Sequence, residues 1–296
     1  CSKNTDGKTA CEAGQCVIPK LNTIQQLHQN YHTLINLDTC KDSSDREYYD
    51  SARPVELTVE GVVTAIREDE LGFVIQEPSE DGKQAGIYVY CQGKDCMKYT
   101  GTDTHIQIGD NVKITSDGIG HFYCQMQIRS FQNKLKIEKT NKTESIAPVI
   151  VLANDLNTGK PDSPYYGSLV TIERFTTGTD KQENPTGWPG LDENGKDIIV
   201  NNGLKPETLN AMEPQKTYQV TGIVNWAFNK NVIVPRSNDD IIFQPNCEEN
   251  ETSVKCLKMA GTVYLTTCTD GQETQEACAS NKQCDKDNQI CRDLAI

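Results

Sequence analysis

The sequence predicts a mostly β protein in which two small closed barrels stand between disulfide-stapled ends. Three observations favour this fold class. Apolar and polar residues alternate with a period of two in many short runs, the same order of runs occurs twice, and 13 cysteines fall largely into two groups. We therefore divide the 296 residues into an N-terminal segment with one helix at 1–50, barrels at 51–143 and 144–243, and a Cys-rich microdomain at 244–296.

The first barrel is predicted from five short strands. Gly, Pro, Asp and Asn mark the turns between them, and the strands are expected, antiparallel throughout, at 55–66, 71–77, 86–91, 110–115 and 121–128. Gly61 interrupts the long first strand, and a glycine there lets the strand bend as closure requires.

The second barrel is predicted because the pattern recurs. Strands are expected at 167–175, 197–201, 217–228 and 231–235. The run VTVEGVVTAI in the first half and YQVTGIVNWAF in the second are both β-branched stretches broken by one glycine, which indicates a diverged copy.

One helix is expected at 22–36, where Ile24, Leu27 and Tyr31 recur at three- and four-residue spacing. His28 and His32 lie one turn apart, a spacing that can hold a metal, but no Glu follows His28 as in zinc proteases. We expect both histidines on an exposed flank of the helix and no metal.

The cysteines indicate an oxidising compartment, because such a load is unusual in a reducing cytosol. No two are separated by only two residues, so the usual zinc pattern is absent. Disulfides are expected within each of two sets of six, with the pairing left open. The candidates are Cys11, Cys16, Cys40, Cys91, Cys96 and Cys124, then Cys247, Cys256, Cys268, Cys278, Cys284 and Cys291.

Cys1 is the odd cysteine, and it opens the sequence. Mature bacterial lipoproteins begin on an acylated cysteine, and several acyl chains on one residue give stable membrane anchoring. We expect lipidation at Cys1 and, with Ser2 following, placement at the bacterial outer membrane, exposed at the cell surface or in the periplasm. Asn141 and Asn250 lie in glycosylation sequons; whether either is modified is left open.

Residues 20–243 resemble the tandem OB-fold modules that accompany catalytic domains in secreted bacterial nucleases, and related modules in surface lipoproteins. The resemblance is carried by TIQQL at 23–27, VELTVEGVVTAI at 55–66, GFVIQEP at 72–78, GIYVYC at 86–91, IGDNVKIT at 108–115, PVIVLANDLN at 148–157, YYGSLVTIERF at 165–175, TYQVTGIVNW at 217–226 and PRSNDDII at 235–242. It implies a fold more than a function. The resemblance would place a large metal-dependent nuclease domain after these modules, whereas here we expect a short Cys-rich segment in its place.

Motifs of catalysis are absent. The four histidines lie in no recognisable motif, and neither GxSxG nor a P-loop occurs. A nuclease of the OB type needs acids that hold a metal and two arginines for phosphate, but the first barrel offers only Arg67 and Arg129 from residue 55 on, without a matching acidic motif. We expect no enzyme activity, cofactor or metal.

Binding is better supported than catalysis. If Ile87 and Val89 face the core, Tyr88 and Tyr90 stand on the outer face that OB-folds use for ligands, unless they only cover the barrel or pack on the N-terminal helix. Trp188, in a TGWPG stretch taken as a loop, is the third candidate for a ligand or partner face. The net charge of −13 disfavours nucleic acid.

The functional expectation is a non-catalytic, surface-anchored lipoprotein. It would act as a structural or accessory subunit through contacts with other envelope or extracellular proteins. One alternative is a binding module for a surface glycan or single-stranded nucleic acid, and another is an accessory protein of a secreted nuclease.

Overall fold

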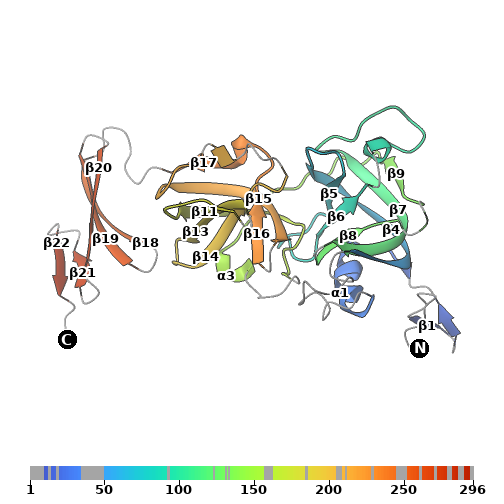
Figure 1. The fold of residues 1–296 in the computed structure, drawn as a ribbon, viewed down its shortest axis with the longest axis horizontal. Coiled ribbons are helices and arrows are strands. Elements are labelled where there is room, and N and C mark those ends of the chain that lie inside the picture. Colours follow the sequence, from blue (N-terminus) through green and yellow to red (C-terminus); the bar gives the residue numbers. More distant parts are fainter. Residues whose placement is uncertain are drawn as a thin grey trace.

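The computed structural model describes most of the two barrels and parts of both ends. The described residues are 10–12, 15–17, 20–34, 50–91, 94–122, 124–130, 132, 134–156, 163–183, 186–204, 209–210, 212–227, 230–244, 252–259, 262–269, 272–278, 282–285 and 290–293. Cys1, Cys40, Cys247, Asn250 and the side chain of His32 lie outside them. Figure 1 shows the two large sheets side by side, with the C-terminal strands beyond the second.

The first sheet contains a closed ring of five strands. Its strands are β3 (Lys20–Leu21), β4 (Asp50–Ile66), β5 (Gly72–Gln76), β6 (Gly86–Tyr90), β7 (Asn111–Phe122), β8 (Gln125–Ile128) and β9 (Lys136–Lys139). The pairing order β4-β5-β6-β8-β7 returns to β4, which confirms a small closed barrel. The pair β6–β8 is parallel, so the expectation of antiparallel strands throughout was wrong at this seam.

The predicted break between 110–115 and 121–128 was also wrong. A single strand, β7, runs through the Ser-Asp-Gly stretch. Ser116 Oγ donates to the Gly118 carbonyl at 3.2 Å and accepts from its N–H at 3.3 Å, opposite a register shift in β4 between Pro54 and Leu57. Two residues of β4, Val55 and Glu56, thus lie opposite Asp117 alone, so β4 carries a bulge that bends the pair without ending β7.

The core of this barrel includes helix α1 (Ile24–Leu34). Ile24 and Leu27 are fully buried in the same cluster as Phe73, Ile87 and Val89, so the predicted inward face of β6 is confirmed. The helix begins with a reciprocal cap, because Thr23 Oγ1 accepts from Gln26 N at 3.0 Å while Gln26 Oε1 accepts from Asn22 N at 2.8 Å. The apolar residues that recur along the helix thus pack it against the core of the barrel.

The second sheet closes in the same order as the first. Its strands are β10 (Val149–Ile150), β11 (Leu169–Thr177), β12 (Gln182–Glu183), β13 (Thr186–Asp192), β14 (Asp197–Asn201), β15 (Thr217–Ala227), β16 (Lys230–Val234) and β17 (Ile241–Phe243), with a short helix α3 (Ala153–Leu156). The ring β11-β13-β14-β16-β15 returns to β11, and β14–β16 is the parallel pair. In both rings the third strand therefore lies parallel to the fifth.

Strand β13 was not predicted, because TGWPG has the composition of a turn. Its glycines serve packing instead. A Cβ at Gly190 would overlap the Phe175 ring, and one at Gly187 would overlap the backbone of Val200. Trp188 belongs to this strand and not to a loop.

Both ends form small hairpins. At the N-terminus β1 (Ala10–Glu12) pairs with β2 (Gln15–Val17) and sets Cys11 opposite Cys16. At the C-terminus β18 (Ser253–Met259), β19 (Thr262–Thr269) and β20 (Gln272–Ala277) form one sheet, and β21 (Lys282–Asp285) pairs with β22 (Ile290–Asp293).

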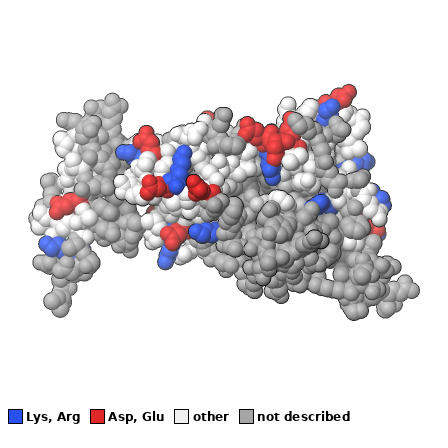
Figure 2. Space-filling view, in the orientation of Figure 1, with Lys and Arg blue, Asp and Glu red and all other residues white. Residues whose placement is uncertain are grey.

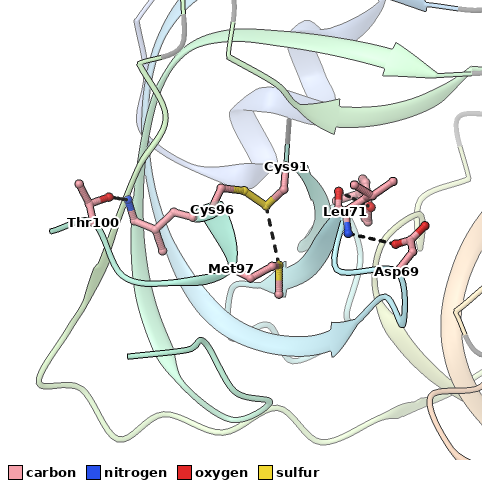
Figure 3. Close-up of a disulfide and its surroundings, with 8 residues drawn as sticks. Asp69, Leu71, Cys91, Cys96, Met97 and Thr100 are labelled. Carbon is pink, nitrogen blue, oxygen red and sulfur yellow. Dashed lines mark hydrogen bonds between the residues drawn. A yellow bond between two sulfur atoms is a disulfide. The ribbon is translucent and has the colours of Figure 1, made fainter. Parts of the chain in front are cut away.

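Three disulfides join described cysteines: Cys91–Cys96, Cys256–Cys284 and Cys278–Cys291. Each lies within one of the two expected sets, and Cys268 is disulfide-bonded as well. Figure 3 shows the first bridge beyond the end of β6, where Cys91 Sγ lies 3.8 Å from Met97 Sδ of the 3-10 turn Lys94–Met97. Cys124 is buried in the barrel core.

Candidate binding site between the barrels

The two barrels share a third apolar cluster. Ala65, Val74 and the partly buried Tyr88 come from the first barrel, whereas its members from the second are Leu169, Ile199, Leu204, Ile223, Val232 and Val234. Trp226 and Tyr166 of the second barrel pack with the core of the first. Burial of apolar side chains is stabilising in proportion to the area removed from water. The shared clusters therefore hold the two barrels together.

Hydrogen bonds cross the same interface. Gln76 is buried, and its Oε1 accepts from Leu169 N at 2.8 Å. Tyr166 donates its hydroxyl to the Met126 carbonyl at 2.9 Å, and Gln125 Nε2 donates to the Trp226 carbonyl at 2.8 Å. These bonds fix how the barrels are oriented, since each links one defined atom to another.

A cavity of about 270 Å³ remains between the barrels beside this contact. The first barrel lines it with Arg67, Tyr88 and Gln125, and the second with Asn202, Leu204 and Asn225, among others. Strands β6, β8 and β15 place Tyr88, Gln125 and Asn225, whereas Arg67, Asn202 and Leu204 lie in the segments that follow β4 and β14. The cavity therefore exists only when the barrels are packed together.

The amide side chains of the cavity keep hydrogen-bonding atoms available. Asn225 uses its Oδ1 for Trp226 N at 2.8 Å, and Gln125 uses its Nε2 for Trp226 O. Among the described residues, that leaves Asn225 Nδ2 as a donor and Gln125 Oε1 as an acceptor. Asn202, which is partly exposed, makes no side-chain hydrogen bond to the described part of the protein. The cavity thus offers both donors and acceptors.

Arg67 is the cation at the rim, and it is already paired. Its Nε donates to Asp69 Oδ1 at 3.0 Å, and its Nη2 forms an ion pair with Asp69 Oδ2. Asp69 also accepts from Leu71 N at 3.0 Å (Figure 3), which holds the turn after β4 in place. Burial alone would lower the pKa of Arg67, but Tyr88 and Asp69 raise it overall.

Tyr88 lines the cavity, but it is committed to the interface and is not freely displayed. Its hydroxyl donates to the Leu71 carbonyl at 3.1 Å, and the Arg67 guanidinium lies 6.0 Å from its ring centroid. Burial raises the pKa of Tyr88 to about 12. Here the alternative considered from sequence, that the ring covers the barrel, describes much of its role.

The other two predicted residues lie elsewhere. Tyr90 shares the outward face of β6 with Tyr88 but does not line the cavity, and the Arg129 guanidinium lies 5.1 Å from its ring centroid. Trp188 was expected to be exposed, and this was wrong. It is 4% exposed in the second core, and its Nε1 donates to the Leu209 carbonyl at 3.5 Å.

His28 was expected on an exposed flank, and this too was wrong. Its Nε2 is 2.8 Å from the Gly86 carbonyl, to which it donates. Burial lowers the pKa of His28 to about 4, against the opposing effect of that hydrogen bond. The imidazole is therefore neutral near pH 7. Its hydrogen bond to Gly86 attaches helix α1 to the first barrel.

Sequence reasoning missed Arg67 as a site residue and missed every amide. Arg67 was considered only as a phosphate ligand of a nuclease, and Asn201-Asn202-Gly203 has the composition of a turn. Gln125 and Asn225 each stand in a strand, where alternation alone predicts an outward polar residue. The signal that unites them is the interface, which no single run of sequence contains.

A second hollow, of about 430 Å³, lies at the far end of the first barrel beside Tyr99, Thr100 and Ile137. Tyr99 donates to Asp110, which Lys139 also contacts at 2.6 Å. Burial would raise the pKa of Asp110, but these hydrogen bonds lower it overall. Tyr99, Asp110 and Lys139 are therefore hydrogen-bonded to one another. We interpret the cluster as structural, because it links the turn before β7 to strand β9.

Two buried acidic residues are paired with arginines. Asp240 contacts Arg236 at 2.7 Å, and Asp285 contacts Arg292 at 3.1 Å. Within the described ranges, no group of three or more His, Cys, Asp or Glu could hold a metal ion. Among the same residues, no helix is both long and apolar enough to cross a membrane.

Surface charge is mixed where the structure describes it. Figure 2 shows Lys and Arg interspersed with Asp and Glu over the second barrel, without a continuous basic patch on this face. Comparison with protein-family models and with curated protein sequences found no match.

Proposed function

We infer that the protein is a non-catalytic binding protein built on two tandem OB-folds. The support for the fold is that both rings share one order, with the first strand paired to the second and the fourth, and the third parallel to the fifth. The same OB-like arrangement was expected from the strand runs at 55–66 and 217–226. OB-folds present ligand and partner surfaces without needing catalytic groups.

The proposed activity is docking to other proteins of an envelope or extracellular assembly. The observation that carries it is strand β17, which among the described strands pairs only with β15. It leaves Ile242 and Phe243 52% and 51% exposed. Tyr218 supports Phe243 from beneath, with ring centroids 5.7 Å apart. A firmly backed aromatic on an edge strand is a typical anchor for a protein contact.

The cellular setting of this proposal follows from the cysteines. Disulfides in the barrel and in the C-terminal hairpins favour an oxidising compartment. With acyl chains at Cys1, the docking unit would be held at a bacterial outer membrane and would face the surface or the periplasm. Electrophoretic mobility and mass spectrometry of the N-terminal peptide from native cells test the anchor directly.

The docking proposal is tested by cross-linking native cells and purifying the protein in mild detergent. Three forms are compared: wild type, Ile242→Ser with Phe243→Ser, and Ile150→Ser as the control. Ile150 is 63% exposed in β10, which pairs with β11 and not with β17. We expect one stoichiometric partner that the double variant loses and the control keeps. A protein recovered alone in all three forms would overturn the proposal.

A second candidate function is ligand binding, and the cavity between the barrels favours it. Hydrogen-bonding amides with available atoms and an apolar wall meet there, which is the usual make-up of a small-molecule site. The ligand classes left open from sequence were a surface glycan and single-stranded nucleic acid. Binding assays with both classes, at low and at high salt, separate them because only nucleic-acid binding weakens steeply with salt.

A further inference from the structure

We propose that the cavity between the barrels binds one neutral sugar residue, as the terminus or a branch of a glycan. This rests on the second candidate function and names its ligand. It is independent of docking through β17.

The size of the cavity sets the first limit. Its volume of about 270 Å³ lies just below the range of roughly 300–1,000 Å³ typical of sites for drug-sized ligands. A space at the lower edge of that range suits a ligand of about one six-membered ring with its substituents. A single pyranose matches this space.

The lining supplies both kinds of surface that a pyranose presents. Leu204, Val74 and Ile223 form an apolar wall, which suits the C–H face of the ring. Asn202, Asn225 and Gln125 add amide atoms that are not used within the described structure, as donors and as an acceptor. Hydroxyl groups both donate and accept, so a polyol satisfies such a mixture where a purely acidic ligand would not.

The charge at the rim favours a neutral ligand. Arg67 is the cation that lines the cavity, and Asp69 neutralises it in a two-bond contact. An anion would have to displace that carboxylate or leave it facing a like charge. The protein also carries a net charge of −13, which repels polyanions. The Arg67–Asp69 pair can instead meet neighbouring hydroxyls, one side donating and the other accepting.

The expected affinity is weak for one residue. A methyl hexoside has about 13 non-hydrogen atoms, and at the ligand efficiency of drug-sized ligands this size corresponds to a Kd on the order of 1 mM. Saturation-transfer NMR with the full chain measures this range. The probes are methyl β-D-glucopyranoside, methyl β-D-galactopyranoside, methyl α-D-mannopyranoside and N-acetylglucosamine, with oligo(dT) and glucuronic acid as charged comparators.

The decisive variants are Asn202→Ala, Ala227→Phe and Asn194→Ala. Asn202 makes no side-chain bond within the described structure, so its loss leaves the fold intact, and Ala227→Phe fills the cavity from β15. Asn194 is an exposed asparagine in the turn after β13 and serves as the control. We expect binding of one neutral probe to weaken at least tenfold in the first two variants and to stay unchanged in the third, at equal melting temperatures.

The contrary outcomes are distinct. A neutral sugar that binds equally to all variants overturns the site but leaves a glycan-binding function standing. Preferential binding of oligo(dT) or glucuronic acid overturns the neutral ligand. If no probe binds at all, the second candidate function fails together with this inference.

Discussion

Gly86 of the first barrel lies against Gly167 of the second, so closely that neither position has room for a Cβ. An added Cβ on Gly86 would overlap the Gly167 carbonyl, and one on Gly167 would overlap the backbone of Gly86 and Ile87. The Gly86 carbonyl also accepts from His28. Helix α1, the first barrel and the second barrel therefore meet at Gly86, where strand β6 begins.

Replacement of Gly167 by alanine is expected to loosen this contact. Gly167 has a φ of +74° and Gly101 a φ of +79°, but nothing lies within 4 Å of a Cβ at Gly101. Gly101→Ala therefore reports backbone strain alone. We expect Gly167→Ala to lower the free energy of unfolding by about 1–3 kcal/mol more than this control does. Equal losses in denaturant titrations would show that the close approach is not important.

Gln76→Leu is expected to destabilise the packed pair through an unpaired N–H. The leucine removes the acceptor of Leu169 N, which is buried between the barrels, and an unsatisfied buried donor costs about 1–3 kcal/mol. Chemical denaturation measures the loss, and Gln25→Leu on the exposed side of α1 is the control. A neutral effect would mean that the N–H finds another partner.

Stability is expected to rise with pH through the titration of His28. Its folded pKa of about 4 is below the ordinary histidine value of 6.5, so between these values the unfolded chain binds more protons. The contribution is fully present above about pH 6.5, is lost as pH falls toward 4, and amounts to about 3 kcal/mol.

His28→Gln tests this, because the amide keeps a donor for the Gly86 carbonyl without a titrating ring. The variant should flatten the stability curve between pH 4 and 6.5, whereas Gln25→Leu, at an exposed position of the same helix, should leave its slope unchanged. Identical slopes in wild type and His28→Gln would contradict the assignment.

Mild reduction is expected to open the C-terminal hairpins and spare the barrels. The Cys278–Cys291 bridge closes a loop with a separation of 13 residues, which stabilises that segment by about 3 kcal/mol. Cys278→Ser with Cys291→Ser should speed proteolysis beyond residue 252. The near-ultraviolet signal of Trp188 and Trp226 should persist, since both lie in the barrels. Loss of that signal would show that the microdomain supports the barrels.

The sequence predicts the strands whose alternation is plain and fails where composition misleads. Ile87 and Val89 face the core as their spacing indicates. By contrast, the Ser116–Gly118 stretch continues strand β7 and Trp188 lies inside a strand, because glycine and proline can serve close packing as well as turns.

The site itself was only partly predictable. Tyr88 was found because its strand has a polar face, but Asn202 and Asn225 acquire meaning only when the second barrel is set against the first. Period-two patterns specify which face a side chain occupies. They say nothing of which other domain covers that face, and so the cavity had no signature in sequence.

The two C-terminal bridges interleave, and this shortens the tether that leads away from the barrels. Unbridged, the stretch of about 35 residues from Cys256 to Cys291 could reach roughly 120 Å when pulled straight. With Cys256 tied to Cys284 and Cys278 tied to Cys291, a pulling force passes through only about six residues, roughly 20 Å of chain, and the two links. Under tension this end behaves as a short, inextensible strap until a reductant lets it lengthen several-fold.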